Sequence, residues 1–302
     1  MRHNKDILWK GMIEEVIEDL LLFVDPEIGK ELDLSRGFEF LDKELAEVFP
    51  DGEKAANTRV VDKLVKIFLR DGEERWMLLH LEVQGSTDKE FARRMFEYYI
   101  RLFSKHGRPV AAIAIFTGRG GKVPATYEDR CLWMRALYEY KLLNIEDYPD
   151  ETLKASSNPF AAVLLVAKEV LLRVKGTDEE CDEVLLKEKL LMVRLLKEKV
   201  AVFGERKTAA VLAFLTNYVV FKKSETNRKF MDQRDQILGE KNTMGIFEQL
   251  VEIKRQEALE EGKGNSVRIL LANTEFSAEK IAELVDIPVA LVEKIKEELK
   301  AK

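Results

Sequence analysis

Two predicted strands of this chain carry acidic and amide side chains in a spacing that suits metal chemistry. Asp62 opens the segment 62–67, and Glu82 and Gln84 stand two residues apart in the segment 79–84. Side chains of a strand alternate between its two faces, so Glu82 and Gln84 are expected to share a face. With Asp62 on a paired strand, two carboxylates would lie within reach of one hard cation, which prefers oxygen ligands. The spacing therefore predicts a site for Mg²⁺ or Mn²⁺ at one edge of a small sheet.

A plainer explanation of the same residues stays open. Acids on neighbouring strands are also found on ordinary solvated sheet faces, where no metal is needed. Residues 71–74, with Gly72 among them, separate the two strands and are typical of a hairpin connection. His80 shares the face of Glu82 and could line a site, but a simple structural placement is the more common role of such a histidine. The residues alone leave both interpretations standing.

Four segments of the chain together resemble one known family. They are FEFLDKEL (38–45), RVVDKLVKI (59–67), WMLLHLEVQ (76–84) and FARRMFEYY (91–99). These segments resemble the recombination-promoting nuclease family, whose members are also labelled transposases and belong to the PD-(D/E)XK nuclease superfamily. The resemblance continues through residues 158–161 into the C-terminal part and covers nearly the whole chain. It implies an α/β fold with a PD-(D/E)XK nuclease-like αβββαβ core, followed by a mainly helical C-terminal region.

Matched position by position, the resemblance implies roles for three residues. Asp62 is expected to be the metal-binding acid, and Glu82 the acid of the family's E-x-K/Q element. Gln84 takes the last position of that element, where the superfamily more often has a lysine. A glutamine can form a hydrogen bond but brings no charge, so this departure bears on the rate of the chemistry.

An acid from the first helix often completes such a site. The helical pattern over 5–24 has an apolar stripe formed by Trp9, Ile13, Val16, Leu20 and Val24. Asp6 and Asp19 flank this stripe, whereas Glu14 and Glu18 are expected to point away. Asp6 or Asp19 is therefore expected to be the further metal ligand, and the pattern does not choose between them.

A second predicted helix, at about 88–105, separates apolar from basic side chains. Its apolar face consists of Phe91, Met95, Tyr99 and Leu102. Arg94, Arg101 and Lys105 fall together on the polar side, where they could contact the phosphate backbone of DNA. The alternative is a solvated helix face on which Glu97 pairs with a neighbouring arginine.

The order of the predicted elements indicates three parts. Residues 1–157 form the nuclease-like core, which includes a nearly all-apolar buried strand at 109–117 and a further strand at 137–143. Residues 158–262 form a helical subdomain. Residues 263–302 form a small helix-turn-helix-like module.

Each of the two later parts carries its own helix signals. The helical subdomain has helices at 159–174, 179–203 and 207–222. In the last part, Ser277 can cap a first helix, and a second is expected at 289–299. Glutamates on this second helix make it a weak DNA reader, so packing or dimerisation is at least as good an interpretation.

Composition bounds the class of protein. The 302 residues are 46% hydrophobic, without an apolar run of about 18 residues and without a signal-peptide pattern, so a cytoplasmic protein with no membrane partner is expected. Cys131 and Cys181 are too few for a disulfide framework or a cysteine-rich zinc site. The formal net charge of −6 does not favour indiscriminate binding of nucleic acid. A homo-oligomer is compatible with the sequence, which leaves the oligomeric state open.

Together, these patterns predict a Mg²⁺-dependent DNA endonuclease, linked through the resemblance to recombination or mobile elements. Asp62 and Glu82 would bind the metal, and Gln84 would orient the nucleophile. The alternative is a catalytically inactive protein that keeps the nuclease fold and binds nucleic acid or protein. Its supporting features are the acidic net charge and the missing lysine. The sequence does not distinguish DNA from RNA as substrate.

Overall fold

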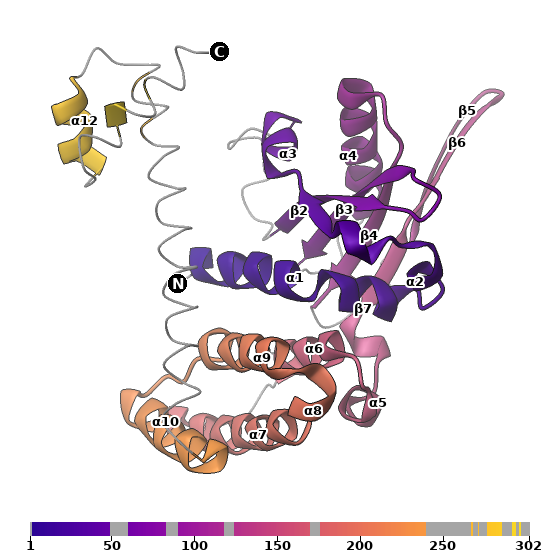
Figure 1. Ribbon diagram of the computed structural model, residues 1–302. Coiled ribbons are helices and arrows are strands. Elements are labelled where there is room, and N and C mark those ends of the chain that lie inside the picture. The colour runs from indigo at the N-terminus through magenta and orange to yellow at the C-terminus, as the bar shows by residue number, and fades with distance from the viewer. Residues whose placement is uncertain are drawn as a thin grey trace. The chain divides into compact units, whose positions relative to one another are not determined.

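The computed structural model describes most of the chain up to residue 239. The described ranges are 2–48, 60–82, 90–117, 124–169 and 176–239, together with residues 267, 271, 277–285, 292, 293 and 296. The chain forms two compact units, Met1–Glu240 and Lys241–Lys302. Within the first unit, Figure 1 shows a twisted sheet and a separate group of helices.

A mixed five-stranded sheet lies at the centre of the first unit. Its strand order is β1-β2-β3-β4-β7. The strands are β1 (Phe38–Phe40), β2 (Val60–Phe68), β3 (Glu74–Glu82), β4 (Val110–Phe116) and β7 (Lys141–Asn144). β1, β2 and β3 pair in antiparallel fashion, whereas β4 is parallel to both β3 and β7. The expected α/β class is confirmed at this level.

The predicted hairpin is formed by β2 and β3, which pair along their full length. Their connection turns at Gly72, whose φ of +90° is a conformation that glycine adopts readily. In the same turn, an Asp71 carboxylate oxygen accepts a hydrogen bond from the N–H of Glu73 at 2.8 Å. Local turn chemistry therefore supports the register of the two strands that carry the predicted acids.

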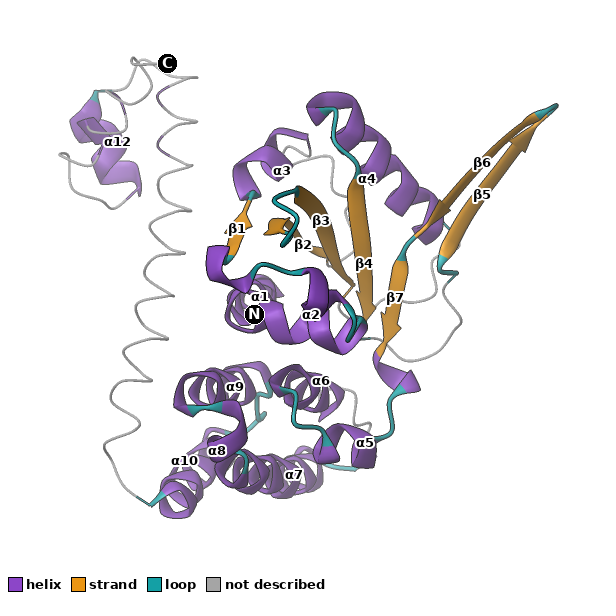
Figure 2. Cartoon of the chain, turned by 45° about the vertical axis from the view of Figure 1, so that its right-hand side comes forward, coloured by secondary structure: helices purple, strands orange, loops and turns teal. Residues whose placement is uncertain are grey.

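Helices cover both faces of the sheet (Figure 2). α1 (Arg2–Val24) packs on one face, with its predicted stripe buried except for the half-buried Val24. α4 (Phe91–His106) connects β3 to β4 and covers the other face together with α3 (Asp42–Val48). Because both faces are covered, β4 is buried along its length except at Ala111, as its apolar sequence predicts.

Between β7 and residue 239, the described part of the chain is helical, as predicted. The further described helices of this unit are α2 (Ile28–Glu31), α5 (Asp150–Ala155), α6 (Pro159–Glu169), α7 (Asp178–Glu198), α8 (Val200–Phe203), α9 (Glu205–Tyr218) and α10 (Ser224–Leu238), with short 3₁₀ helices η1 (Leu34–Arg36) and η2 (Ile145–Asp147). α6, α7 and α9 share one buried apolar cluster with α1 and one face of the sheet. The predicted boundary between residues 157 and 158 falls between α5 and α6, inside this unit.

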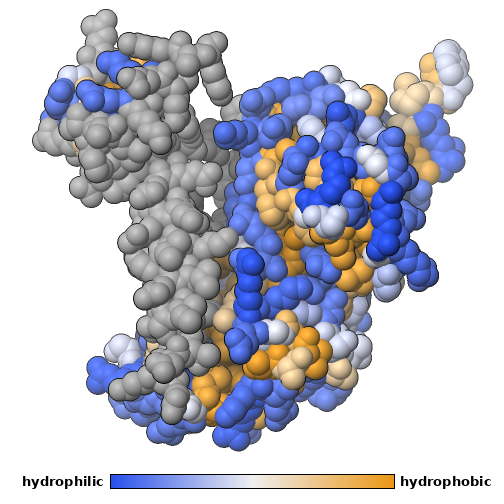
Figure 3. All heavy atoms as spheres, in the orientation of Figure 1, coloured by the Kyte–Doolittle hydropathy of each residue, from blue (hydrophilic) through white to orange (hydrophobic). Residues whose placement is uncertain are grey.

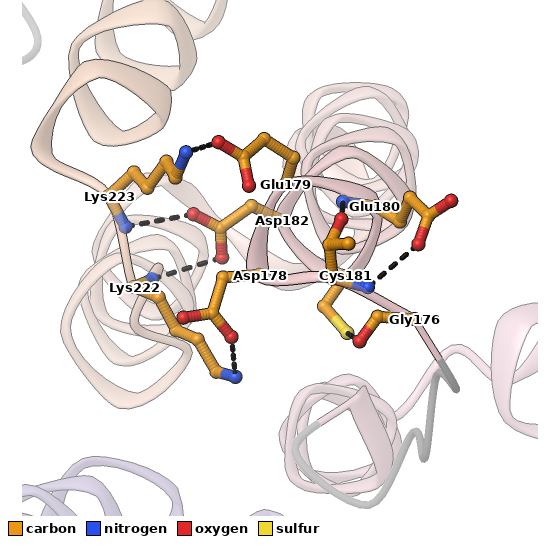
Figure 4. Close-up of polar contacts among 9 residues, drawn as sticks. Gly176, Asp178, Glu179, Glu180, Cys181, Asp182, Lys222 and Lys223 are labelled. Atoms are coloured by element: carbon orange, nitrogen blue, oxygen red, sulfur yellow. Dashed lines mark hydrogen bonds and ion pairs between the residues drawn. The ribbon is translucent and has the colours of Figure 1, made fainter.

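The start of α7 holds the segment between α9 and α10 (Figure 4). Thr177 and Glu180 form a capping box, in which each side chain accepts the backbone N–H of the other residue. Asp182 is buried, and its two carboxylate oxygens accept the backbone N–H groups of Lys222 at 3.0 Å and Lys223 at 2.9 Å. These bonds tie the chain that follows α9 to the first turns of α7.

Two further strands form a separate ribbon. β5 (Thr126–Cys131) and β6 (Met134–Glu139) pair with each other in antiparallel fashion. Figures 1 and 2 show the ribbon projecting away from the sheet. The predicted strand at 137–143 is divided in the structure, since β6 ends at Glu139 and β7 begins at Lys141. The sequence does not predict the ribbon, because most of its side chains are exposed and no apolar alternation marks it.

In the second unit, the described helix is α12 (Ala278–Val285). Ser277 caps it, because its Oγ accepts the N–H of Lys280 at 3.3 Å, and this prediction is confirmed. Most of the second predicted helix and the boundary between 262 and 263 lie outside the described residues. Over the described ranges, no helix combines the length and apolar character needed to span a membrane.

Candidate functional site

The register of the hairpin relates the predicted site residues to one another. Asp62 of β2 lies opposite His80 of β3, and Glu82 lies opposite Val60. Asp62 and Glu82 are therefore diagonal neighbours on paired strands, a relation in which Cα atoms are roughly 7–8 Å apart. Glu82 is also in register with Phe116 of β4. The backbone thus brings the two predicted acids to one end of the sheet.

Several predicted ligands lie outside the described residues. This applies to the side chains of Asp6, Asp62, His80 and Glu82, and to the whole of Gln84. Their roles stay predictions. Among the side chains that the structure describes, no three His, Cys, Asp or Glu residues gather into a metal-binding group. The backbone positions of Asp62 and Glu82 are diagonal, and carboxylate oxygens are ligands that a hard divalent cation prefers.

A buried ion cluster begins at the residue that follows Asp62. Lys63 is only 2% exposed, and its ammonium donates hydrogen bonds to Glu14 at 2.7 Å and to Asp42 at 2.6 Å. Glu14 comes from α1 and Asp42 from α3, so one ammonium joins three elements beside Asp62. The prediction that Glu14 points away is wrong, because the carboxylate of Glu14 pairs with this buried lysine of the sheet.

The charge of Lys63 follows from these contacts. Burial by itself would lower the pKa of Lys63, but the hydrogen bonds to Asp42 and Glu14 outweigh burial and leave that pKa above its ordinary value. The ammonium is therefore charged at neutral pH. Sequence patterns do not reveal the cluster, since a lysine within a strand is normally a sign of an exposed position.

Asp19, the second candidate from the first helix, pairs with the helical region. Its side chain is nearly buried, and the Lys207 ammonium of α9 lies 2.9 Å from its Oδ1 and 2.7 Å from its Oδ2. The backbone carbonyl of Asp19 also accepts a hydrogen bond from the Asn158 side-chain amide at 2.8 Å. Asp19 would have to exchange Lys207 for a metal before it could act as a ligand.

The basic row of α4 lies at the surface. Arg101 and Lys105 are exposed, and Arg94 is half-buried. Lys105 forms an ion pair with Glu47 of α3 at 2.8 Å, which a phosphate would have to replace. Glu97 pairs with the arginine four residues before it, as expected for a solvated helix face.

Comparison with known proteins identifies no relative of this chain. The chain matches no protein-family model, no curated protein and no solved structure.

Proposed function

We propose that this chain is a metal-dependent endonuclease that hydrolyses phosphodiester bonds of DNA. The observation that supports this most is the hairpin register, in which Asp62 and Glu82 occupy diagonal positions at one end of the sheet. A carboxylate pair on adjacent strands can hold a hard cation, and such a cation can activate water for the hydrolysis of a phosphodiester.

The order of the elements also supports the proposal. Helix α1, strands β1 to β3, helix α4 and strand β4 follow one another in the αβββαβ succession that the resemblance implies. The short helices α2 and η1 are inserted between α1 and β1, and α3 between β1 and β2. β4 returns parallel to β3 after the crossover helix, so the sheet is mixed, and Glu82 ends beside the buried strand. This succession is compatible with a PD-(D/E)XK nuclease core.

In the proposed mechanism, each residue of the chain has a limited task. Asp62 and Glu82 would hold Mg²⁺ or Mn²⁺, which when bound lowers the pKa of water and stabilises charge on the phosphate. Gln84 would orient the nucleophile through a hydrogen bond. Lys63 would act as a positioning residue, since its bonds to Glu14 and Asp42 hold β2 in place next to Asp62.

The basic side chains of α4 support nucleic acid as the substrate. Arg94, Arg101 and Lys105 would contact phosphates and so position the substrate without reading its sequence. The resemblance places such an activity in recombination or mobile-element biology.

Cleavage of supercoiled plasmid in Mg²⁺, Mn²⁺ or EDTA tests the function. Wild-type protein should nick or linearise the plasmid only with metal, and Asp62→Ala and Glu82→Ala should each abolish cleavage. Glu73→Ala is the matched control, because it removes an exposed acid from the turn of the same hairpin and should cut normally. Cleavage by Asp62→Ala at the wild-type rate would exclude the assignment.

Metal affinity distinguishes the inactive alternative. If the carboxylate pair is intact, metal binding should stabilise the native state by about 2.7 kcal/mol at a hundredfold excess of metal over Kd, and the melting temperature should rise accordingly. A folded protein that neither cuts plasmid nor gains stability with metal would favour a non-catalytic interaction module. Cleavage of an RNA oligonucleotide alone would change the substrate but keep the site.

A further inference from the structure

The β5–β6 ribbon ends in a large exposed apolar tip. Its two-residue connection consists of Leu132 and Trp133, which are 86% and 92% exposed. Met134 and Leu137 of β6 are also exposed. Figure 3 shows hydrophobic side chains on this projecting ribbon, at the upper right of the view, beside hydrophilic ones. Clustered exposed apolar residues of this kind mark interaction surfaces more often than single ones do.

The backbone of the tip is not one that these residues favour. Leu132 has a φ of +52°, and it is the one described residue other than glycine with a positive φ. Two-residue hairpin turns favour Asn, Asp or Gly in this conformation, because β-carbons strain it. The identities of Leu132 and Trp133 are therefore not explained by turn formation, which points to a role for their side chains.

The two faces of the ribbon differ in chemistry. On one face, Glu128 accepts hydrogen bonds from both Arg130 and Arg135, so this face is polar and charged. The opposite face, by strand alternation, consists of Tyr127, Asp129, Cys131, Met134, Ala136 and Tyr138. That face is thus mostly apolar, and at Cys131 and Met134 it is exposed.

Aromatic rings anchor the base of this face on α4. Phe96 stacks on Tyr127 with ring centres 4.9 Å apart, and Tyr99 meets Tyr138 at 5.1 Å. Tyr99 also stacks on Phe103 at 5.8 Å, so the aromatic contacts continue from the ribbon base along α4. The base is therefore fixed to the body, whereas the tip stands free of it.

α4 carries a second exposed apolar pair near this base. Ile100 and Phe103 are 44% and 45% exposed. Figure 2 shows α4 and the ribbon diverging from their common base. One molecule thus presents an apolar tip and, on a neighbouring element, an apolar receiving surface of the same chemistry.

We propose that the ribbon is a dimerisation arm, whose tip residues Leu132 and Trp133 pack on Ile100 and Phe103 of a second copy. The arrangement is reciprocal, because a twofold dimer uses each patch of one copy against the complementary patch of the other. Each copy then covers both of its exposed apolar sets at once. An aromatic anchor at the centre of such an interface is typical of the residues that dominate binding energy.

Charge argues against nucleic acid or an anionic lipid surface as the partner of the ribbon. The ribbon strands carry Glu128, Asp129 and Glu139 against Arg130 and Arg135, and both arginines already bond Glu128. Such a surface does not attract phosphates of nucleic acid or of a lipid surface.

Topology also separates the tip from the proposed nuclease site. β6 continues into β7, which runs parallel to β4 towards Phe116, the residue in register with Glu82. The tip therefore lies beyond the other end of these strands. Asp62 and Glu82 lie at the open end of the β2–β3 hairpin, away from the tip.

Sedimentation of the full chain over a range of concentrations tests the arm. Wild-type protein should dimerise, and Trp133→Ser should raise the dimer dissociation constant about tenfold or more. Ile100→Ser should act in the same direction. Val202→Ser is the matched control, since it removes an exposed apolar side chain from α8 and should leave the dissociation constant unchanged. A wild-type chain that stays monomeric, or a Trp133→Ser chain that dimerises normally, would overturn the proposal.

Fluorescence and cross-linking report the contact directly. Trp9 and Trp76 are buried, so the difference between wild type and Trp133→Phe isolates emission from the tip, which should shift to the blue as dimers form. In a Cys181→Ser background, native Cys131 of one copy should cross-link to an Ile100→Cys, Cys131→Ser copy through a short bis-maleimide. Absence of this product in a dimer would overturn the reciprocal contact. A blue shift of a monomer on phosphatidylserine vesicles or on duplex DNA would instead assign the tip to those partners.

Discussion

Two buried lysines, one in the sheet and one among the helices, are satisfied in opposite ways. Lys63 of β2 donates to the carboxylates of Glu14 and Asp42. Lys189 of α7 is fully buried and donates to the backbone carbonyls of Thr216 at 3.1 Å and Val219 at 2.7 Å. One ammonium therefore meets opposite charges, whereas the other meets neutral dipoles.

The difference determines which lysine keeps its proton. Burial, together with the nearby Arg234, lowers the pKa of Lys189 to about 7. The rings of Phe230 and Phe221, 4.1 and 4.7 Å from its ammonium, favour the charged form but are outweighed. A neutral amine still has N–H groups for the carbonyl oxygens, so deprotonation leaves these bonds possible. A buried lysine beside carboxylates is thus locked in its charge, and one beside carbonyls is not.

The helical region also contains a buried acid whose partners are backbone groups. Asp182 is buried and accepts two backbone N–H groups (Figure 4). Backbone bonds to Asp182, together with the ion pairs Lys222–Asp178 and Lys223–Glu179, hold the segment after α9 on α7. The side-chain bonds of Lys63 hold α1 and α3 on the sheet. In both regions a charge is used where chain segments distant in sequence must be joined.

The largest expected effect is at Lys63. Lys63→Met removes two charge-assisted hydrogen bonds that join a buried ammonium to the partly exposed carboxylates of Glu14 and Asp42, and it should lower the free energy of unfolding by about 3 kcal/mol. Urea denaturation followed by circular dichroism measures this loss. Lys30→Met is the control, since its pair with Glu27 is exposed and its loss should change stability by less than about 0.5 kcal/mol. Equal effects of the two substitutions would mean that the buried cluster contributes nothing special.

A smaller loss is expected at Asp182. Asp182→Ala leaves the N–H groups of Lys222 and Lys223 without their acceptor in a nearly buried place, and it should cost about 2 kcal/mol. Asp178→Ala removes an exposed carboxylate from the same helical turn, whose partner is the Lys222 side chain, and should be close to neutral. Comparison of the two melting curves separates the backbone contact from the surface ion pair.

The smallest effect at neutral pH is expected at Lys189. Lys189→Met removes two hydrogen bonds, which destabilises the fold, and it also removes the free-energy cost of burying an amine. Because these two contributions offset each other, the free energy of unfolding should change by less than about 1 kcal/mol near pH 7. As pH rises from about 7 to about 10, the unfolded lysine binds more protons than the folded one, and wild type should gain stability relative to the variant. Lys63, whose folded pKa is raised, should show no such slope against Lys63→Met over this range. Parallel slopes for both lysines would remove the contrast between them.

Local patterns explain which elements the sequence could predict. The hairpin, α4 and β4 each have a periodicity and an end signal within their own residues, and all three are found. The ribbon was not predicted because its turn residues Leu132 and Trp133 carry no turn signal. For the candidate site, alternation predicted that Glu82 and Gln84 share a face, whereas the register that sets Asp62 opposite His80 and the partner of Glu14 came from the structure.

Side-chain alternation and helical periodicity act over a few residues, so the sequence was sufficient to predict the sheet hairpin, the buried strand and the amphipathic helices. Which charges are buried, and which groups satisfy them, depends on packing between elements. Lys63 meets partners 49 and 21 residues away, and Lys189 meets carbonyls 27 and 30 residues away. Since these partners come from other elements, no local pattern contains them. The surroundings that packing creates keep Lys63 charged and allow Lys189 to lose its proton near neutral pH.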